Sequence, residues 1–276
     1  MIGQQRVQQS VSLWLDRGFP RFSIISGPAG SGKKVLAAEI SKNLCYFPTF
    51  VFDTSKDMIV QIIEEAYKAL DIRVYILCDS DNMSVQTKNS LLKVLEEPPN
   101  NAYFILLCEN KYLLPPTIRS RGVNFDMDPY SKAELAEYIN SLNIDPNAVE
   151  LILNIADNPG EINAFIDSDV FDLYDFVTLV INNIAEVSGS NAFKIADKLA
   201  LKKDQDGYDL KLFWKVFNFV CMSERAIKYI DDAPVFTKYG KAVLITDSYL
   251  SKLNIKGINL MHLFDNWILD IRKEWL

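Results

Sequence analysis

The sequence predicts an α/β domain built on a parallel sheet, followed by an all-α region. Short apolar runs of strand length alternate with helical patterns up to about residue 128, which is typical of a parallel sheet covered on both faces. A glycine-rich loop at residues 27–34 separates the first apolar run from a helical pattern. From residue 170 onward only helical periodicity remains.

The first predicted elements alternate between helix and strand. Residues 4–16 place apolar side chains at helical spacing, and the apolar, β-branched run FSIIS (22–26) ends at the glycine-rich loop. Helical spacing returns over residues 33–44. The segment TFVFD (49–53) is the second strand candidate.

The same alternation continues through the next segments. Apolar residues line one side of the helix expected over 58–70, and RVYILCD (73–79) is a buried strand that ends at an acid. The helix expected over 84–97 is stopped by two prolines. The last two strands are expected over residues 103–109 and 123–127.

After Pro129 the pattern becomes helical throughout. Short helices are expected over 131–142, 146–157 and 160–168, and longer ones over roughly 170–186, 191–202, 209–230, 238–253 and 259–273. We therefore expect three domains: an α/β domain over residues 1–128, a small helical domain over 129–168, and a helical carboxy-terminal domain over 169–276.

Composition excludes several classes of protein. Hydrophobic residues make up 49% of the chain and charged residues 24%, which excludes a disordered or low-complexity protein. The polar start and the lack of an apolar run of ~18–20 residues predict a cytoplasmic protein with no membrane contact. Four separated cysteines without a CxxC pair predict reduced thiols and no zinc site. The chain has a single histidine, His262, which argues against histidine-based catalysis.

The charge distribution favours a phosphate-bearing ligand over a general DNA coat. The net charge is −7, which opposes nucleic-acid binding through lysine and arginine. Residues 1–50, however, carry six Lys/Arg against two Asp/Glu, whereas residues 51–200 carry 11 against 24. The basic excess therefore lies in the segment that contains the glycine-rich loop.

That loop is a phosphate-binding motif with one altered position. The segment Gly27-Pro28-Ala29-Gly30-Ser31-Gly32-Lys33-Lys34 fits GxxxxGK between a strand and a helix. Its glycines let backbone N–H groups surround a phosphate, and Lys33 would reach the outer phosphates of a nucleotide. The next position should be a serine or threonine that ligates Mg²⁺, but Lys34 has no lone pair to offer while it is charged.

The acid expected at the end of a later strand is Asp79. In hydrolytic versions of this arrangement a second acid follows it and polarises the attacking water, whereas this chain has Ser80. Asp81 lies two residues beyond Asp79 and is expected to point elsewhere. The residues therefore predict a nucleotide site with impaired hydrolysis.

From these residues onward the chain resembles the AAA+ clamp-loader subunits of the bacterial delta-prime/gamma branch, with a bacteriophage or compact version as one explanation of its departures. Ile2-Gly3-Gln4 resembles the box before the first helix, and residues 90–122 resemble the stretch that ends in the family's Ser-Arg-Cys motif. The resemblance implies a P-loop domain, a helical lid over 129–168 and a carboxy-terminal collar over 169–276 that mediates oligomerisation.

Four elements of the family's phosphate chemistry are altered together. Lys34 replaces the metal-binding hydroxyl, and Ser80 replaces the catalytic acid. Glu109 lies where sensor 1 should offer an amide or hydroxyl, and Glu161 lies in a sensor 2 segment without arginine. Arg121 is retained, although the family's cysteine after it is Gly122. The resemblance implies that Arg121 is an arginine finger, which acts in trans on a neighbouring subunit's nucleotide.

The resemblance thus implies a non-hydrolysing, delta-prime-like subunit. It would assemble with other AAA+ subunits into a hetero-oligomeric ring and help load a sliding clamp onto primer-template DNA. The loop and Lys33 favour bound ATP or ADP, whereas Lys34 and Glu109 oppose it, and Mg²⁺ is expected only with nucleotide. Lys88 is a weak candidate for a DNA phosphate contact. Two alternatives stay open: an active gamma-like ATPase that uses Asp79 or Asp81, and an AAA+-derived regulatory scaffold.

Overall fold

The computed structural model describes residues 3–45, 48–142, 144–184, 195–201, 206–253, 255 and 257–275. They form two compact units. The α/β unit comprises Met1–Ser141 and Asp157–Gly160, and the helical unit comprises Leu142–Ala156 and Glu161–Leu276. Ile2 and the start of the helix predicted over 191–202 lie outside the described residues.

A five-stranded parallel sheet forms the centre of the α/β unit, as predicted. Its strand order is β2-β3-β4-β1-β5, so β1 lies between two strands that come much later in the sequence. The strands are β1 (Phe22–Ser26), β2 (Thr49–Val51), β3 (Arg73–Leu77), β4 (Ala102–Cys108) and β5 (Val123–Asp126). β3 ends two residues before the predicted boundary, because Asp79 takes a left-handed backbone conformation with φ 50°.

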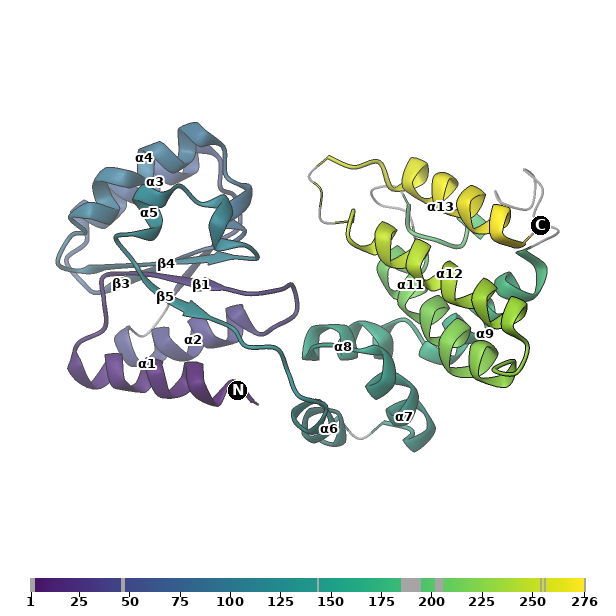
Figure 1. The fold of residues 1–276 in the computed structure, drawn as a ribbon. Helices are drawn as coiled ribbons and strands as arrows, with labels where there is room; N and C mark the ends of the chain where they lie inside the picture. The colour runs from purple at the N-terminus through teal and green to yellow at the C-terminus, as the bar shows by residue number, and fades with distance from the viewer. Residues whose placement is uncertain are drawn as a thin grey trace. The chain divides into compact units, whose positions relative to one another are not determined.

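Helices cover both faces of the sheet (Figure 1). One face is covered by α1 (Gln5–Arg17) and α2 (Lys33–Leu44), and the other by α3 (Lys56–Lys68), α4 (Val85–Glu96) and the short α5 (Pro116–Arg119). Two separate apolar cores result. Ile24 belongs to the core under α3 and α4, whereas the next residue, Ile25, belongs to the core under α1 and α2. This alternation explains why the strands read as continuous apolar runs.

Short helical elements connect the strands. Two 3₁₀ turns, η1 (Ser80–Asn82) and η2 (Lys111–Leu113), follow β3 and β4, and α6 (Lys132–Asn140) follows β5. A capping box starts α6, because Ser131 and Glu134 bond to each other's backbone N–H groups. These connections place η1 and η2 at the edge of the sheet where the strands end.

The helical unit packs around tryptophans. Its elements are α7 (Pro146–Ile155), α9 (Val170–Asn183), α11 (Leu210–Phe219), the π-helical turn η4 (Val220–Ala226), α12 (Ala233–Leu250) and α13 (Leu260–Trp275), with α8 (Pro159–Asp167) entering from the α/β unit. Trp267 is fully buried, and its ring contacts the rings of Phe213, Trp214, Phe217 and Phe264. Its indole N–H donates to Thr246 Oγ1 at 3.0 Å, so the buried polar atom is satisfied.

Three helical boundaries differ from the sequence prediction. α12 begins at Ala233 instead of residue 238, because Asp232 caps it and a proline occupies its first turn. The helix predicted over 209–230 changes to π-helical geometry at Val220. Within the described part of the helix predicted over 191–202, helix ends at Ala196, and Leu199 forms an isolated bridge with Tyr208.

Among the residues that the structure describes, no helix combines the length and the apolarity needed to cross a bilayer.

Candidate functional site

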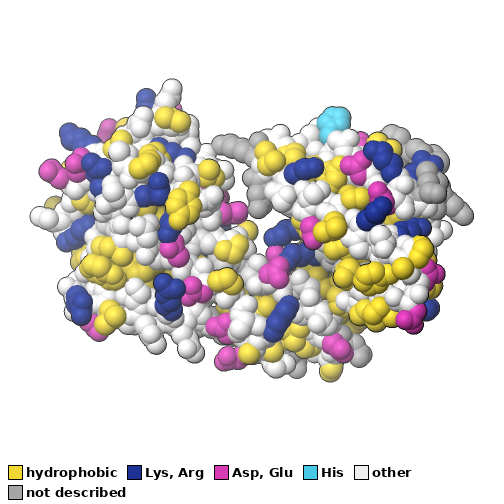
Figure 2. All heavy atoms as spheres, in the orientation of Figure 1, with side chains coloured by type: hydrophobic (Ala, Val, Ile, Leu, Met, Phe, Trp, Pro, Cys, Tyr) yellow, Lys and Arg dark blue, Asp and Glu magenta, His cyan; other side chains and the backbone are white. Residues whose placement is uncertain are grey.

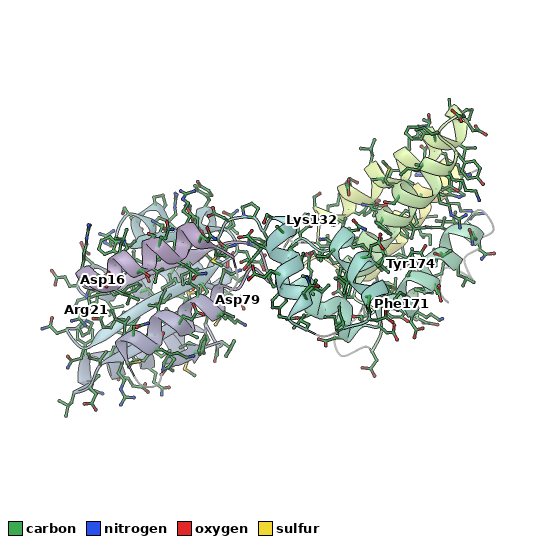
Figure 3. All side chains as sticks on the ribbon, turned by 90° about the horizontal axis from the view of Figure 1, so that it is seen from below. Asp16, Arg21, Asp79, Lys132, Phe171 and Tyr174 are labelled. Atoms are coloured by element: carbon green, nitrogen blue, oxygen red, sulfur yellow. The ribbon has the colours of Figure 1, made fainter. Side chains whose placement is uncertain are left out.

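The glycine-rich loop emerges from an inner strand of the sheet. It connects β1 to α2, and β1 pairs with β4 on one side and β5 on the other. Asp79 lies at the same, carboxyl edge of the sheet, whereas Arg21 lies at the opposite, amino edge (Figure 3). Ligands of open parallel sheets bind at the carboxyl edge, so the sheet brings Gly27–Lys34 and Asp79 together where a ligand is expected.

The backbone of the loop requires glycine at two places. Gly30 has φ 78° and Gly32 has φ 91°, a region that L side chains rarely adopt. Gly30 also touches a second segment of the same unit: its carbonyl accepts from the Gly160 N–H at 3.1 Å. A Cβ on Gly30 would lie 2.2 Å from Asn158 Oδ1. The segment Asn158–Gly160 therefore lies directly against the loop.

Lys33 is bonded to its own loop. Its ammonium donates to the carbonyl oxygens of Gly27 and Pro28 at 2.7 and 2.8 Å. Burial lowers the pKa of Lys33, and the negative charges of Glu109, Asp81 and Asp79 oppose that shift in part. The acidic surroundings therefore compete with phosphate for the charge of this lysine.

Lys34 has a different partner from Lys33. Its ammonium lies over the ring of Phe52, 4.8 Å from the ring centroid, in a cation–π contact with the residue that follows β2. The two adjacent ammonium groups therefore do not form one common phosphate site. A side chain that ends in an ammonium also cannot replace the hydroxyl that would ligate Mg²⁺.

The residues after β3 are engaged in local structure. Ser80 is buried, and its hydroxyl donates to the Leu77 carbonyl at 2.8 Å. Asp81 is 8% exposed, and its Oδ2 accepts from the backbone N–H groups of Glu109 and Asn110, both at 3.1 Å. Oδ2 of Asp81 thus joins η1 to the end of β4, while its Oδ1 is buried without a hydrogen-bond partner among the described residues.

Lys88 is buried instead of exposed to a DNA backbone. Its ammonium donates to the carbonyl oxygens of Asp81 at 2.8 Å and Leu113 at 3.0 Å, and the residue is 8% exposed. The expected phosphate contact is therefore wrong. Lys88 instead holds η1 and η2 together beside the site, because a buried ammonium needs hydrogen-bond acceptors.

The loop fits a phosphate group but not a magnesium ion. The left-handed glycines shape the turn, and Ser31 Oγ is buried without a hydrogen-bond partner among the described residues, so it is a donor for an anion. ATP or ADP would be held by the loop N–H groups, Ser31 and Lys33. For Mg²⁺, Lys34 supplies no ligand where the motif has a hydroxyl, because its ammonium has no lone pair.

The Gly3-Gln4 box fixes the segment that follows β5. Gln4 is 2% exposed, and its side-chain amide both donates to the Asp128 carbonyl at 2.6 Å and accepts from the Asp128 N–H at 2.8 Å. Two residues later, the Tyr130 hydroxyl donates to the Ser31 carbonyl at 2.9 Å. The box is thereby linked through Asp128–Tyr130 to the glycine-rich loop.

Glu161 forms ion pairs with two lysines in the helical unit. It is 7% exposed, and its carboxylate accepts from Lys211 at 2.7 Å and from Lys215 at 2.5 Å. Both lysines belong to α11, so Glu161, which was expected in a sensor 2 segment, joins α8 to α11.

Arg121 lies on the surface in the turn after α5. Its Nη1 donates to the Thr117 carbonyl at 2.6 Å, and its Nη2 donates to Glu96 Oε1 at 3.1 Å. The side chain is 31% exposed. The guanidinium is therefore held in place yet accessible.

The sequence identified the altered positions but not their partners. Phe52, Tyr130 and Glu96 were not singled out, because each meets its partner only through the tertiary fold. The one available signal was for Glu96, which lies inside the LLKVLEEPP stretch that also carries the family resemblance.

Comparison with known proteins gives matches to clamp-loader subunits. The family model described as "DNA polymerase III, delta subunit" matches residues 49–131. DNA polymerase III subunit gamma of Buchnera aphidicola is 26% identical over 193 residues, covering 56% of this chain and 53% of that protein. Subunit delta′ of Bacillus subtilis is 26% identical over 106 residues, covering 37% and 32%. The chain thus spans about a third to a half of these relatives.

Solved structures show the same fold at low identity. A DNA polymerase III gamma subunit-related protein of Thermotoga maritima has a TM-score of 0.53 and 16% identity, with 98% of this chain and 99% of that chain covered. The RuvB Holliday junction branch migration motor of Thermotoga maritima has a TM-score of 0.51 and 18% identity, with 81% and 78% covered. These similarities confirm the predicted α/β fold with a helical carboxy-terminal region.

Proposed function

We propose that this chain, which is similar to AAA+ clamp-loader subunits, is a delta-prime-like subunit of a DNA-replication clamp loader that does not hydrolyse ATP. The observation that carries the proposal is the state of the residues after β3. Ser80, which directly follows Asp79, is bonded to the Leu77 carbonyl, and the Asp81 carboxylate is buried with its Oδ2 on two backbone N–H groups, so no exposed acid directly follows Asp79 to activate water.

Arg121 gives this subunit a catalytic role at a neighbour's site. An arginine finger contributes ~10³–10⁵ in rate in other phosphoryl-transfer systems, because its charge stabilises the transition state. In this chain the guanidinium is held by two contacts and partly exposed, while the chain's own loop lacks a metal ligand at Lys34. Donating Arg121 in trans is therefore consistent with the loss of hydrolysis in cis.

Nucleotide binding without turnover fits the loop. Backbone N–H groups and Ser31 favour a phosphate, whereas the acidic surroundings of Lys33 weaken its attraction. ATP or ADP would then act as a structural ligand of the ring.

The proposed partners are other AAA+ clamp-loader subunits, a sliding clamp and primer-template DNA. On the face shown in Figure 2, basic side chains of the α/β unit are interspersed with acidic ones. With a net charge of −7, this chain contacts DNA through the assembled ring. We also propose the three-domain division: P-loop domain to residue 128, lid to 168, and collar for oligomerisation from 169.

A turnover assay distinguishes this role from that of a gamma-like ATPase. Purified chain with ATP and Mg²⁺ should show no hydrolysis above background, because Ser80 replaces the water-activating acid and Lys34 replaces the metal-ligating hydroxyl. Turnover that is lost in a Lys33→Ala variant would establish the gamma-like alternative. A regulatory scaffold would be indicated if the chain copurified without an AAA+ ATPase.

The finger is tested in the assembled complex. Arg121→Ala should lower the complex's ATPase rate by about tenfold or more, because one transition-state cation is lost. Arg17→Ala is the matched control, since Arg17 is an exposed arginine at the end of α1. Equal rates for both variants would contradict the finger assignment.

A further inference from the structure

We infer that Glu96 is a positioning residue that holds the Arg121 guanidinium ready for a neighbouring subunit's nucleotide. This inference rests on the finger role proposed above and deepens it. Glu96 is the last residue of α4, and Arg121 follows α5, so the ion pair joins two residues that are 25 positions apart in the sequence. The carboxylate holds the end of a side chain that would otherwise sample many rotamers.

The backbone of the finger is fixed independently of this ion pair. The Arg121 N–H donates to the Ile118 carbonyl at 3.1 Å, and Ile118 is fully buried. Asn124 Nδ2 donates to the carbonyl oxygens of Arg119 at 3.4 Å and Gly122 at 3.3 Å. Because the backbone is already anchored, only the Arg121 side chain still has to be held in one conformation.

The two contacts leave most of the guanidinium's donors for a ligand. A guanidinium carries five N–H groups, of which the Thr117 carbonyl and Glu96 Oε1 each receive one. The side chain is 31% exposed, and that of Glu96 is 59% exposed. A phosphate can therefore approach an ordered guanidinium without first breaking both contacts.

The next residue provides a matched control. Glu97 has the same charge, is exposed and lies at the same end of α4, yet it forms no ion pair among the residues that the structure describes. A general effect of negative charge at this helix end would appear for both glutamates. An effect through Arg121 would appear for Glu96 alone.

The first test uses the isolated full chain. Nitrogen-15 NMR of arginine side chains, with the Arg121 signal assigned by its loss in Arg121→Ala, reports rotation of the guanidinium. We expect Glu96→Ala to move this signal to the averaged position of free arginines and Glu97→Ala to leave it unchanged. An unchanged signal in Glu96→Ala would overturn the inference.

The second test is a double-mutant cycle in the assembled complex. Glu96→Ala should lower the ATPase kcat by about three- to fivefold, the rate equivalent of one exposed charge pair, with KM for ATP unchanged. Glu96→Gln should lose less, because its amide oxygen still accepts a hydrogen bond. In the Arg121→Ala background, Glu96→Ala should have no further effect.

The outcomes distinguish this inference from the proposed function. If Arg121→Ala lowers the rate but Glu96→Ala matches Glu97→Ala, the positioning role fails and the finger stands. If Glu96→Ala lowers the rate equally in the Arg121→Ala background, its effect is structural and the inference fails. If Arg121→Ala has no effect, the finger assignment itself fails.

Discussion

The turn that carries Arg121 has no space for a side chain at the residue that follows. A Cβ on Gly122 would lie 2.8 Å from Cε1 of the Phe22 ring, and Phe22 is buried in the core under α3 and α4. Glycine at position 122 therefore fits the close approach of the Phe22 ring. The large ring at the start of β1 occupies the volume that a side chain at 122 would need.

Gly122→Ala should destabilise the α/β unit by about 1–3 kcal/mol, because the added methyl overlaps the Phe22 ring. The free energy of unfolding is measured by urea denaturation followed by circular dichroism. Gly240→Ala is the control, since a Cβ there meets nothing within 4 Å. In the interior of α12 that change should stabilise by about 0.5–1 kcal/mol. Equal effects of the two variants would contradict the steric account.

The carboxylate of Asp126 joins three elements near the glycine-rich loop. Asp126 at the end of β5 accepts from Ser26 at the end of β1 and from Lys111 in η2, at 2.5 Å for the lysine. Burial opposes ionisation of Asp126, but these two hydrogen bonds outweigh it and lower its pKa. The ionised carboxylate therefore stabilises the edge of the sheet from which the loop emerges.

The lowered pKa predicts a pH dependence. The stabilisation by Asp126 is fully present above the unfolded aspartate pKa of ~3.9 and is lost as pH falls through the lower folded value. At neutral pH Asp126→Asn should melt about 2–4 °C below the natural chain. The two melting temperatures should converge as pH falls below the lowered folded pKa of Asp126. A difference that stays constant with pH would show that charge is not the cause.

In the helical unit, Glu161 joins α8 to α11 through two lysines of unequal burial. The Lys215 side chain is 13% exposed and that of Lys211 is 41% exposed. Lys215→Met should cost about 2–3 kcal/mol, somewhat less than a fully broken buried pair because Lys211 remains. Lys211→Met should cost at most about 1 kcal/mol. Urea unfolding followed by the fluorescence of Trp214 and Trp267 measures both, and a larger cost for Lys211→Met would refute this ranking.

At the scale of the whole molecule, the sequence predicted those features that depend on local patterns, namely strands, helices and the glycine-rich loop. All five strands and the helices α1 to α4 were expected, because each buried strand and each amphipathic helix carries its own periodicity, whereas the short α5 was not predicted. The loop and its altered positions were likewise readable from spacing. Partners of these positions were not, since Lys34 meets Phe52 and Gly30 meets Asn158 only after distant segments pack. Lys88 was misjudged for the same reason: its burial depends on Leu113, 25 residues away.

The central place of β1 in the sheet has a consequence for synthesis on the ribosome. β1 ends at Ser26, but its two neighbours begin at Ala102 and Val123. At a translation rate of ~5–20 residues per second, roughly 4–15 seconds pass between the synthesis of the apolar run FSIIS and that of β4. β2 and β3 can pair during that interval. The nascent chain therefore carries an unpaired strand directly ahead of its glycine-rich loop until β4 and β5 have been made.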